Sequence, residues 1–184
     1  MNRQSRHTPL QLRLVRPLPL AVRADAARLI AEEFGREIAP WSDRRTALVL
    51  IRRGLRRERI IAALDGQGRL VGLTGLRGPR GGALALPRGR AAAALDRVLG
   101  LAAPRTADLV LDCLVVSPGW RGRGVAALLI AAALTEAERR GHPGLRAEVA
   151  RRNAPALAAF RRAGFAPQRG WPGGARVLRL TVYR

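Results

Sequence analysis

The chain has 184 residues, of which 48% are hydrophobic and 4% aromatic, so its length suits one domain with a core built mainly from aliphatic side chains. Its net charge of +21 is extreme, and every basic residue is Arg, with no Lys. The single cysteine excludes an intrachain disulfide and a cysteine-based zinc site, and no run of 18 apolar residues predicts a transmembrane helix.

Hydrophobic periodicity predicts a series of strands and helices through the first half of the chain. In order, these are a strand over 10–15, a helix over 24–34, a helix from the Ser42 or Asp43 cap to about Arg53, and strands over 60–64 and 70–76. Gly35 is expected to end the first helix. The turn Asp65–Gly68 is expected to join the two strands as a β-hairpin. Residues 1–8 are expected to form a disordered basic N-terminus, which leaves residues 9–184 for one folded domain.

The second half is predicted to alternate strands with helices. The elements are an irregular loop over 78–90, a helix over 91–101, a strand over 109–116, a helix from Val125 to the Gly141 cap, a strand over 145–150, a helix from the Asn153 cap to Gly164, and a strand over 177–183. The apolar run 109–116 is typical of a central strand that is buried on both faces. The helix that starts at Val125 is predicted from the helical spacing of Val125, Leu128, Leu129 and Ala132. The pattern indicates an α/β fold of the mixed α+β kind, in a single domain.

The segment between the strand 109–116 and the following helix has the composition of an anion-binding turn. It reads Arg121-Gly122-Arg123-Gly124-Val125-Ala126. Glycines let the backbone approach an anion closely, and a helix start presents unpaired N–H groups with a partial positive charge. We therefore expect a pyrophosphate site here. A plain tight turn with solvated arginines is the alternative.

Two other phosphate-binding motifs fit this turn less well. A Walker A loop requires Lys, which the chain lacks. The dinucleotide-binding fingerprint matches loosely at Gly122, Gly124 and Ala127, with Glu148 roughly 20 residues further on. Against it, Ser117–Arg121 separate the predicted strand from the first glycine, and Glu148 falls inside the next predicted strand rather than at its end.

The turn and a second segment resemble the GNAT superfamily of N-acetyltransferases. The turn fits the family's acyl-CoA motif Arg/Gln-x-x-Gly-x-Gly/Ala, and Leu114–Pro118 is similar to the strand end that leads into it. The second segment, from Asn153 through Phe160 to Gly164-Phe165, resembles the family's Asn-aromatic-Gly-Phe segment. The resemblance implies a GNAT-like mixed sheet whose two central strands splay apart, with acyl-CoA in the notch.

The resemblance also implies which residues bind acetyl-CoA, the acyl-donor substrate. The cofactor-binding residues are Leu114, Val115, Val116, Arg121, Gly122, Arg123, Gly124, Val125, Ala126, Asn153 and Phe160. The amides of Gly122–Ala126 would hold the pyrophosphate, and the backbone of Leu114–Val116 would pair with the pantetheine arm. The amide of Val116 would polarise the thioester carbonyl. Asn153 would contact the arm near its reacting end. No metal is expected.

Acyl transfer to a primary amine requires a neutral nitrogen, so a base is needed near the thioester. Glu148 is the first catalytic candidate, because it lies on the strand that lines the notch and precedes Asn153 by the spacing that some family members use. A carboxylate in an apolar notch is expected to have a raised pKa, which suits a base. Pairing with one of the many arginines is the alternative. Asp112, on the facing strand, is the second candidate.

Two further residues bear on the mechanism. Phe160 stands where many family members have a Tyr that protonates the leaving thiolate, so this residue cannot be a general acid. A thiol with a pKa of about 8.5 leaves readily without one. Cys113 would suggest a covalent acyl-enzyme, but neither His7 nor His142 is placed to activate it, and a packing role is expected.

The predicted function is an N-acetyltransferase that moves an acetyl group from acetyl-CoA to a primary amine, on a protein or a small molecule, by direct transfer in a ternary complex. The resemblance also implies a homodimer as one oligomeric state. One alternative is a basic nucleic-acid- or ribosome-associated binding protein, although the Arg, Ala, Gly and Pro bias also fits the codon usage of a GC-rich bacterial genome. The other alternative is a CoA-binding family member without activity. A cytoplasmic location and no membrane partner are expected.

Overall fold

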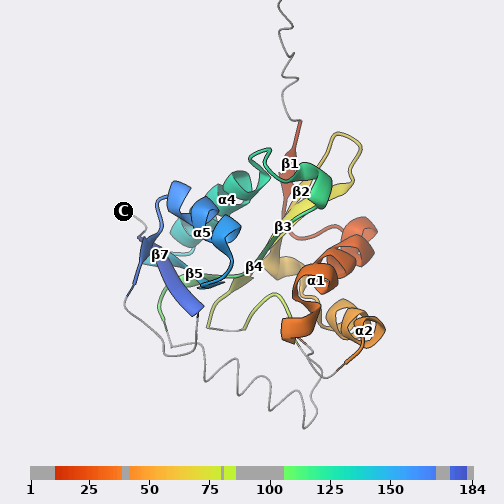
Figure 1. Ribbon diagram of the computed structural model, residues 1–184. Helices are drawn as coiled ribbons and strands as arrows, with labels where there is room; N and C mark the ends of the chain where they lie inside the picture. The colour runs from red at the N-terminus through yellow and green to blue at the C-terminus, as the bar shows by residue number, and fades with distance from the viewer. Residues whose placement is uncertain (1–10, 39–41, 80, 86–105, 169–174, 182–184) are drawn as a thin grey trace, which may run out of the picture.

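The computed structural model describes residues 11–38, 42–79, 81–85, 106–168 and 175–181. These ranges form one seven-stranded sheet with helices on both faces (Figure 1). The strands are β1 (Arg13–Val15), β2 (Ile60–Leu64), β3 (Leu70–Arg77), β4 (Leu109–Val116), β5 (Gly144–Ala150), β6 (Ala166–Pro167) and β7 (Ala175–Thr181). Their order in the sheet is β1-β2-β3-β4-β5-β7-β6, and β4–β5 is the parallel pair. The predicted mixed α/β class is confirmed.

Within the described ranges, four α-helices flank the sheet. They are α1 (Arg23–Ile38), α2 (Arg44–Gly54), α4 (Val125–Arg139) and α5 (Ala154–Arg162). In Figure 1, α4 and α5 cover one face of the sheet, and α1 and α2 lie on the other. None of the helices in the described ranges is long and apolar enough to span a membrane.

The predicted helix boundaries are confirmed at α2 and wrong at α1. Asp43 caps α2, because its carboxylate accepts a hydrogen bond from the Thr46 amide at 2.7 Å. The prediction that Gly35 ends α1 is wrong, since the helix continues to Ile38. Ile38 packs against the core beneath α1, and this packing outweighs the low helix propensity of one glycine.

The predicted hairpin over β2 and β3 is confirmed, with antiparallel pairing from Ile60↔Gly75 to Leu64↔Leu70. Asp65 organises the turn, because its Oδ1 accepts hydrogen bonds from the amides of Gln67 and Arg69, both at 2.9 Å.

Several other predictions change in detail or fall outside the described residues. The predicted strand 10–15 is three residues long in the described part, and the short strand β6 was not predicted. The predicted N-terminal disorder over 1–8, the predicted helix 91–101 and part of the predicted loop 78–90 lie outside the described residues.

The core has two parts, one on each face of the sheet. Beneath α4 and α5, aliphatic side chains pack with Phe160 and Phe165; beneath α1 and α2, a second cluster is centred on Ile30, Ile51 and Leu73. Leu128, one of the apolar residues whose spacing predicted helix α4, is 43% exposed. The buried stripe of α4 follows the i, i+4 row instead, at Val125, Leu129, Ala133 and Ala137.

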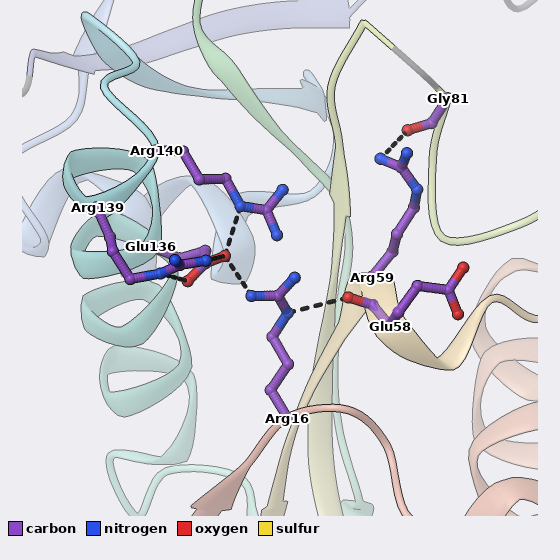
Figure 2. A network of polar contacts seen from close by, with 7 residues as sticks. All are labelled: Arg16, Glu58, Arg59, Gly81, Glu136, Arg139 and Arg140. Carbon is purple, nitrogen blue, oxygen red and sulfur yellow. Dashed lines mark hydrogen bonds and ion pairs between the residues drawn. The ribbon is translucent and has the colours of Figure 1, made fainter.

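An ionic cluster ties the end of α4 to the chain that follows β1. Figure 2 shows Arg16, Arg139 and Arg140 converging on the carboxylate of Glu136, whose side chain is 10% exposed. Arg16 also donates to the carbonyl of Glu58 at 3.0 Å, so the cluster reaches the segment before β2. Hydrogen bonds, first of all from Arg139, lower the pKa of Glu136 to about 2.

Candidate active site

The candidate site lies where β4 and β5 separate. The two strands pair in parallel from Leu109 to Leu111 of β4 and from Leu145 to Ala147 of β5, although both strands continue further. Directly after Leu111 the register between β3 and β4 shifts, so Asp112 is an extra, bulged residue. A bulge bends its strand and interrupts regular pairing. We call the region beyond Leu111 and Ala147, where the described parts of β4 and β5 no longer pair, the split.

The split also explains why β4 is not buried along its whole length, as its apolar sequence predicted. Leu109, Val110 and Leu111 are buried, whereas Asp112 is exposed, and Leu114 and Val116 are half-buried. Without β5 beside them, these residues lose one neighbouring strand. The expectation of full burial is wrong for this half of the strand.

The backbone of β4 presents alternate residues to the split. Ser117, next after β4, donates its amide to the Val71 carbonyl at 2.9 Å, so this residue belongs to the β3 side. Hydrogen-bonded and non-hydrogen-bonded pairs alternate along an antiparallel ladder, so the backbone groups of Val116 and Leu114 point to the opposite edge, toward the split. The Val116 carbonyl accepts a hydrogen bond from Arg121 Nε at 3.1 Å, which fits this direction. The backbone of Val115 faces β3, and its side chain is buried.

The chain leaves β4 through a short 3-10 helix, η3 (Pro118–Trp120), and an exposed turn over 121–124. Gly122 and Gly124 have φ values of 74° and 82°, in the left-handed region. A Cβ at either position would meet nothing within 4 Å, so conformation rather than space is what requires glycine here.

The turn ends at the uncapped N-terminus of α4. Gly124 is the N-cap residue and offers no side chain to cap the helix, and the first helical bond runs from the Leu128 amide to the Gly124 carbonyl at 3.1 Å. The amides of Val125, Ala126 and Ala127 therefore have no partner within the helix. Such a helix start carries partial positive charge and suits an anion.

The two arginines of the turn have other contacts in this structure. Arg121 pairs with Glu33 of α1 at 3.0 Å in addition to its bond to Val116. The Arg123 guanidinium lies 5.5 Å from the centroid of the Trp120 ring. Trp120 itself packs against the core beneath α4. The anion-binding capacity of the turn therefore rests on its amides, with the arginines beside them.

Charged side chains gather at the start of the split. Arg77, the last residue of β3, places Nε 3.1 Å from Asp112 Oδ1 and Nη2 3.6 Å from Glu148 Oε1. The side chains of Arg77, Asp112 and Glu148 are 27%, 27% and 29% exposed. The expected apolar surroundings of Glu148 are therefore wrong, because a guanidinium that also pairs with Asp112 lies beside it. Pairing with an arginine, the alternative considered from the sequence, is what the structure has.

Comparison with known proteins decides the family. The sequence model of the acetyltransferase (GNAT) family matches residues 25–165, more than half of the chain. The chain belongs to the acetyltransferase (GNAT) family. The matched range contains the bulge, the split, the glycine turn and α5. The resemblance seen in the motifs is confirmed, and the protein is a GNAT-family acetyltransferase.

Solved structures support the same fold for this acetyltransferase. An N-acetyltransferase from Staphylococcus aureus Mu50 has a TM-score of 0.70 at 16% identity, covering 91% of this chain and 100% of that chain. SsHAT has a TM-score of 0.66 at 21% identity, covering 95% and 100%. The PaiA N-acetyltransferase from Thermoplasma acidophilum, solved in complex with coenzyme A, has a TM-score of 0.59 at 12% identity, covering 92% and 98%. Among curated proteins, none matches the sequence.

The second motif of the acetyltransferase supplies structure at α5. Asn153 caps α5, and its Oδ1 accepts a hydrogen bond from the Ala156 amide at 3.1 Å. Phe160 is buried and packs edge to face on Phe165, with ring centroids 5.0 Å apart. Contact of Asn153 and Phe160 with acetyl-CoA stays a prediction.

Cys113 is placed as a packing residue. Burial, together with the charge of Asp112, raises the pKa of its thiol to about 12. The protonated thiol is a poor nucleophile, which disfavours an acyl-enzyme. Among the described residues, no group of three or more His, Cys, Asp or Glu side chains is arranged to hold a metal ion.

Arg77 is the site residue that the sequence did not single out. It is the last residue of β3, one position beyond the predicted strand 70–76, and its position gives no local signal among 34 basic residues. Only the sheet order, which places β4 between β3 and β5, brings it to both candidate carboxylates.

Proposed function

We propose that this acetyltransferase transfers the acetyl group of acetyl-CoA directly to a primary amine within a ternary complex. The observation that carries the proposal is the uncapped start of α4, directly after two left-handed glycines and the end of β4. Amides that lack a helical partner suit the pyrophosphate of the donor. The split beside them leaves the edge of β4 available to the pantetheine arm.

The backbone of β4 would then direct the thioester. The N–H of Val116 points into the split, where it can donate to the thioester oxygen as negative charge develops during attack. Arg121 fixes the neighbouring carbonyl of Val116 and so limits movement of this peptide segment. Leu114 offers a second pair of backbone groups two residues earlier.

Glu148 would remove the proton from the attacking amine, directly or through one water. It lies on the β5 side of the split, opposite the β4 backbone, and its side chain remains partly accessible. In the transfer the amine nitrogen forms a bond to the acetyl carbon, the carbon–sulfur bond breaks, and CoA leaves as the thiolate. The amine proton passes to Glu148 or its water. The thiolate needs no acid from Phe160, because a thiol with a pKa of about 8.5 is a good leaving group.

Two measurements test the proposal. Acetyl-CoA and CoA should raise the thermal midpoint of the protein, because a ligand that binds the folded state stabilises it. Acetyl-CoA should then release thiol with at least one member of a panel of amino acids, peptides with free N-termini, lysine analogues and aminoglycosides. Stabilisation without amine-dependent thiol release would favour a CoA-binding protein without transferase activity.

A further inference from the structure

Arg77 reaches both candidate catalytic carboxylates from a strand that neighbours only one of them. It belongs to β3, Asp112 to β4 and Glu148 to β5, and the sheet order is β3-β4-β5. In the register, Arg77 lies level with Val110, before the bulge. Its guanidinium therefore extends across β4 at the point where β4 and β5 begin to separate.

Asp112 is engaged through both of its carboxylate oxygens. Oδ1 accepts from Arg77 Nε at 3.1 Å, and Oδ2 accepts from the Ala83 amide at 3.0 Å. The segment next to Ala83 approaches so closely that a Cβ on Gly82 would lie 2.0 Å from Asp112 Oδ2. These contacts anchor the carboxylate, and they anchor Arg77 through it. An oxygen that already accepts a hydrogen bond is poorly placed to take a proton from a substrate.

Glu148 lies further from the Arg77 guanidinium than Asp112 does. The distance of 3.6 Å between Nη2 and Oε1 exceeds a hydrogen bond, so Arg77 supplies charge while the Glu148 oxygens keep their accepting capacity. Both side chains are less than one third exposed, so solvent screens this pair less than a fully exposed surface pair. The guanidinium can thus fix where the Glu148 carboxylate lies without occupying its proton-accepting atoms.

We infer that Arg77 is a positioning residue for acetyl transfer, anchored by Asp112, that holds the Glu148 carboxylate at the split. The inference rests on the proposed role of Glu148 as the base. Asp112 then anchors Arg77 and does not itself accept the proton of the amine. Neither residue needs to contact the acetyl group or the amine in order to act in this way.

The test replaces Arg77 in two protein backgrounds. Arg77→Met keeps an unbranched, apolar stem and removes the charge, and Arg77→Lys keeps the charge without the guanidinium geometry. Each is made in the wild type and in Glu148→Gln, and kcat and KM for acetyl-CoA are measured with an amine of the panel that the wild type acetylates. We expect Arg77→Met to lower kcat about ten-fold or more while KM for acetyl-CoA changes less than about two-fold, because misplacement of a base slows chemistry rather than donor binding.

The remaining variants separate positioning from stability. Arg77→Lys should recover part of kcat, and Arg77→Met should lower kcat no further in Glu148→Gln, because the residue acts through Glu148. Asp112→Asn should reproduce part of the loss, since the amide oxygen can still accept from Ala83 but carries no charge for Arg77. The matched control is Arg179→Met, which removes a 29%-exposed arginine of β7 paired with Asp108, the residue directly before β4, and should leave kcat unchanged whatever it does to stability.

Three results would overturn the inference. Arg77→Met with wild-type kcat would show that the guanidinium has no part in transfer. An equal loss of kcat in the wild-type and Glu148→Gln backgrounds would mean that Arg77 acts independently of Glu148. A wild-type protein that acetylates no amine of the panel would remove the proposed function itself and the inference with it, and this outcome is recognised before any variant is compared.

Discussion

Leu111 lies opposite Ala147 at the last position where β4 and β5 pair, and the bulged Asp112 follows at once. The candidate active site of the acetyltransferase is a consequence of this relationship. If the pairing continued to the end of β5, the backbone groups of Leu114 would be bound to β5 and this edge of β4 would be closed to a thioester ligand. The bulge thus turns the middle of a sheet into two accessible strand edges.

The glycine turn should bind acetyl-CoA through its backbone conformation. Gly124→Ala places a Cβ on a residue with a φ of 82°, which costs about 1–2 kcal/mol or makes the turn adopt another conformation. We expect the Kd for acetyl-CoA, measured by calorimetry, to rise about ten-fold. Gly68→Ala is the matched control, because Gly68 has a φ of 77° and equally open surroundings in the β2–β3 turn. It should reduce stability similarly and leave the Kd unchanged; equal effects of the two variants on Kd would contradict the assignment.

The amide of Val116 should contribute to the chemical step. Val116→Pro removes this N–H, and we expect kcat to fall about a hundred-fold while acetyl-CoA still binds, as for loss of one oxyanion donor. Val115→Pro is the comparison, because the Val115 backbone faces β3, so this proline should lower the thermal midpoint far more. Equal thermal midpoints of the two variants would contradict the assignment of the Val115 backbone to β3 and the Val116 backbone to the split. A wild-type kcat in Val116→Pro would contradict the oxyanion role of the Val116 amide.

The ionic cluster around Glu136 should stabilise the protein in a pH-dependent way. The pKa of Glu136 in the folded state is about 2, below its ordinary value of 4.5, so its contribution is complete above about pH 5 and is lost as the pH falls toward 2. We expect Glu136→Gln to lower the free energy of unfolding at pH 7 by about 2 kcal/mol, with a difference from the wild type that shrinks on acidification. Denaturant titrations at several pH values measure this, and the exposed Glu138→Gln on the same helix is the control. A difference that does not depend on pH would contradict the account.

Cys113 should be chemically inert in the folded protein. Because its thiol pKa is raised to about 12, little thiolate is present at pH 8, and alkylation by iodoacetamide should be much slower than after unfolding. Cys113→Ala should acetylate amines at a rate within about two-fold of the wild type, as expected of a packing residue. Mass spectrometry of the protein after incubation with acetyl-CoA alone provides the complementary check, and an acetyl group on Cys113 would refute direct transfer.

The elements that the sequence predicted well are those set by local patterns. The Asp43 cap of α2, the Asp65 turn and the Asn153 cap of α5 each depend on neighbours within a few residues. Errors arose where distant packing decides. Gly35 stays helical because α1 continues over the core to Ile38, which periodicity alone does not reveal.

The candidate site likewise has a part that depends on neighbouring residues and a part that depends on distant ones. The glycine turn and the helix start behind it could be predicted from the sequence, because the residues that determine them lie within six positions of one another. The environment of Glu148 was not, because it depends on Arg77, 71 positions earlier in a chain with 34 basic residues. The position of the bulge follows from the register of β3 against β4. The apolar run 109–116 by itself does not indicate which of its residues is bulged.

Amine-dependent release of CoA thiol from acetyl-CoA tests the central claim most directly. The purified wild-type protein is incubated with acetyl-CoA, with and without each amine of the panel, and free thiol and acetylated amine are both quantified. The account predicts that one class of amine accelerates thiol release and is recovered acetylated in equal amount. Thiol release that no amine changes, or no release from a protein that binds acetyl-CoA, would contradict it.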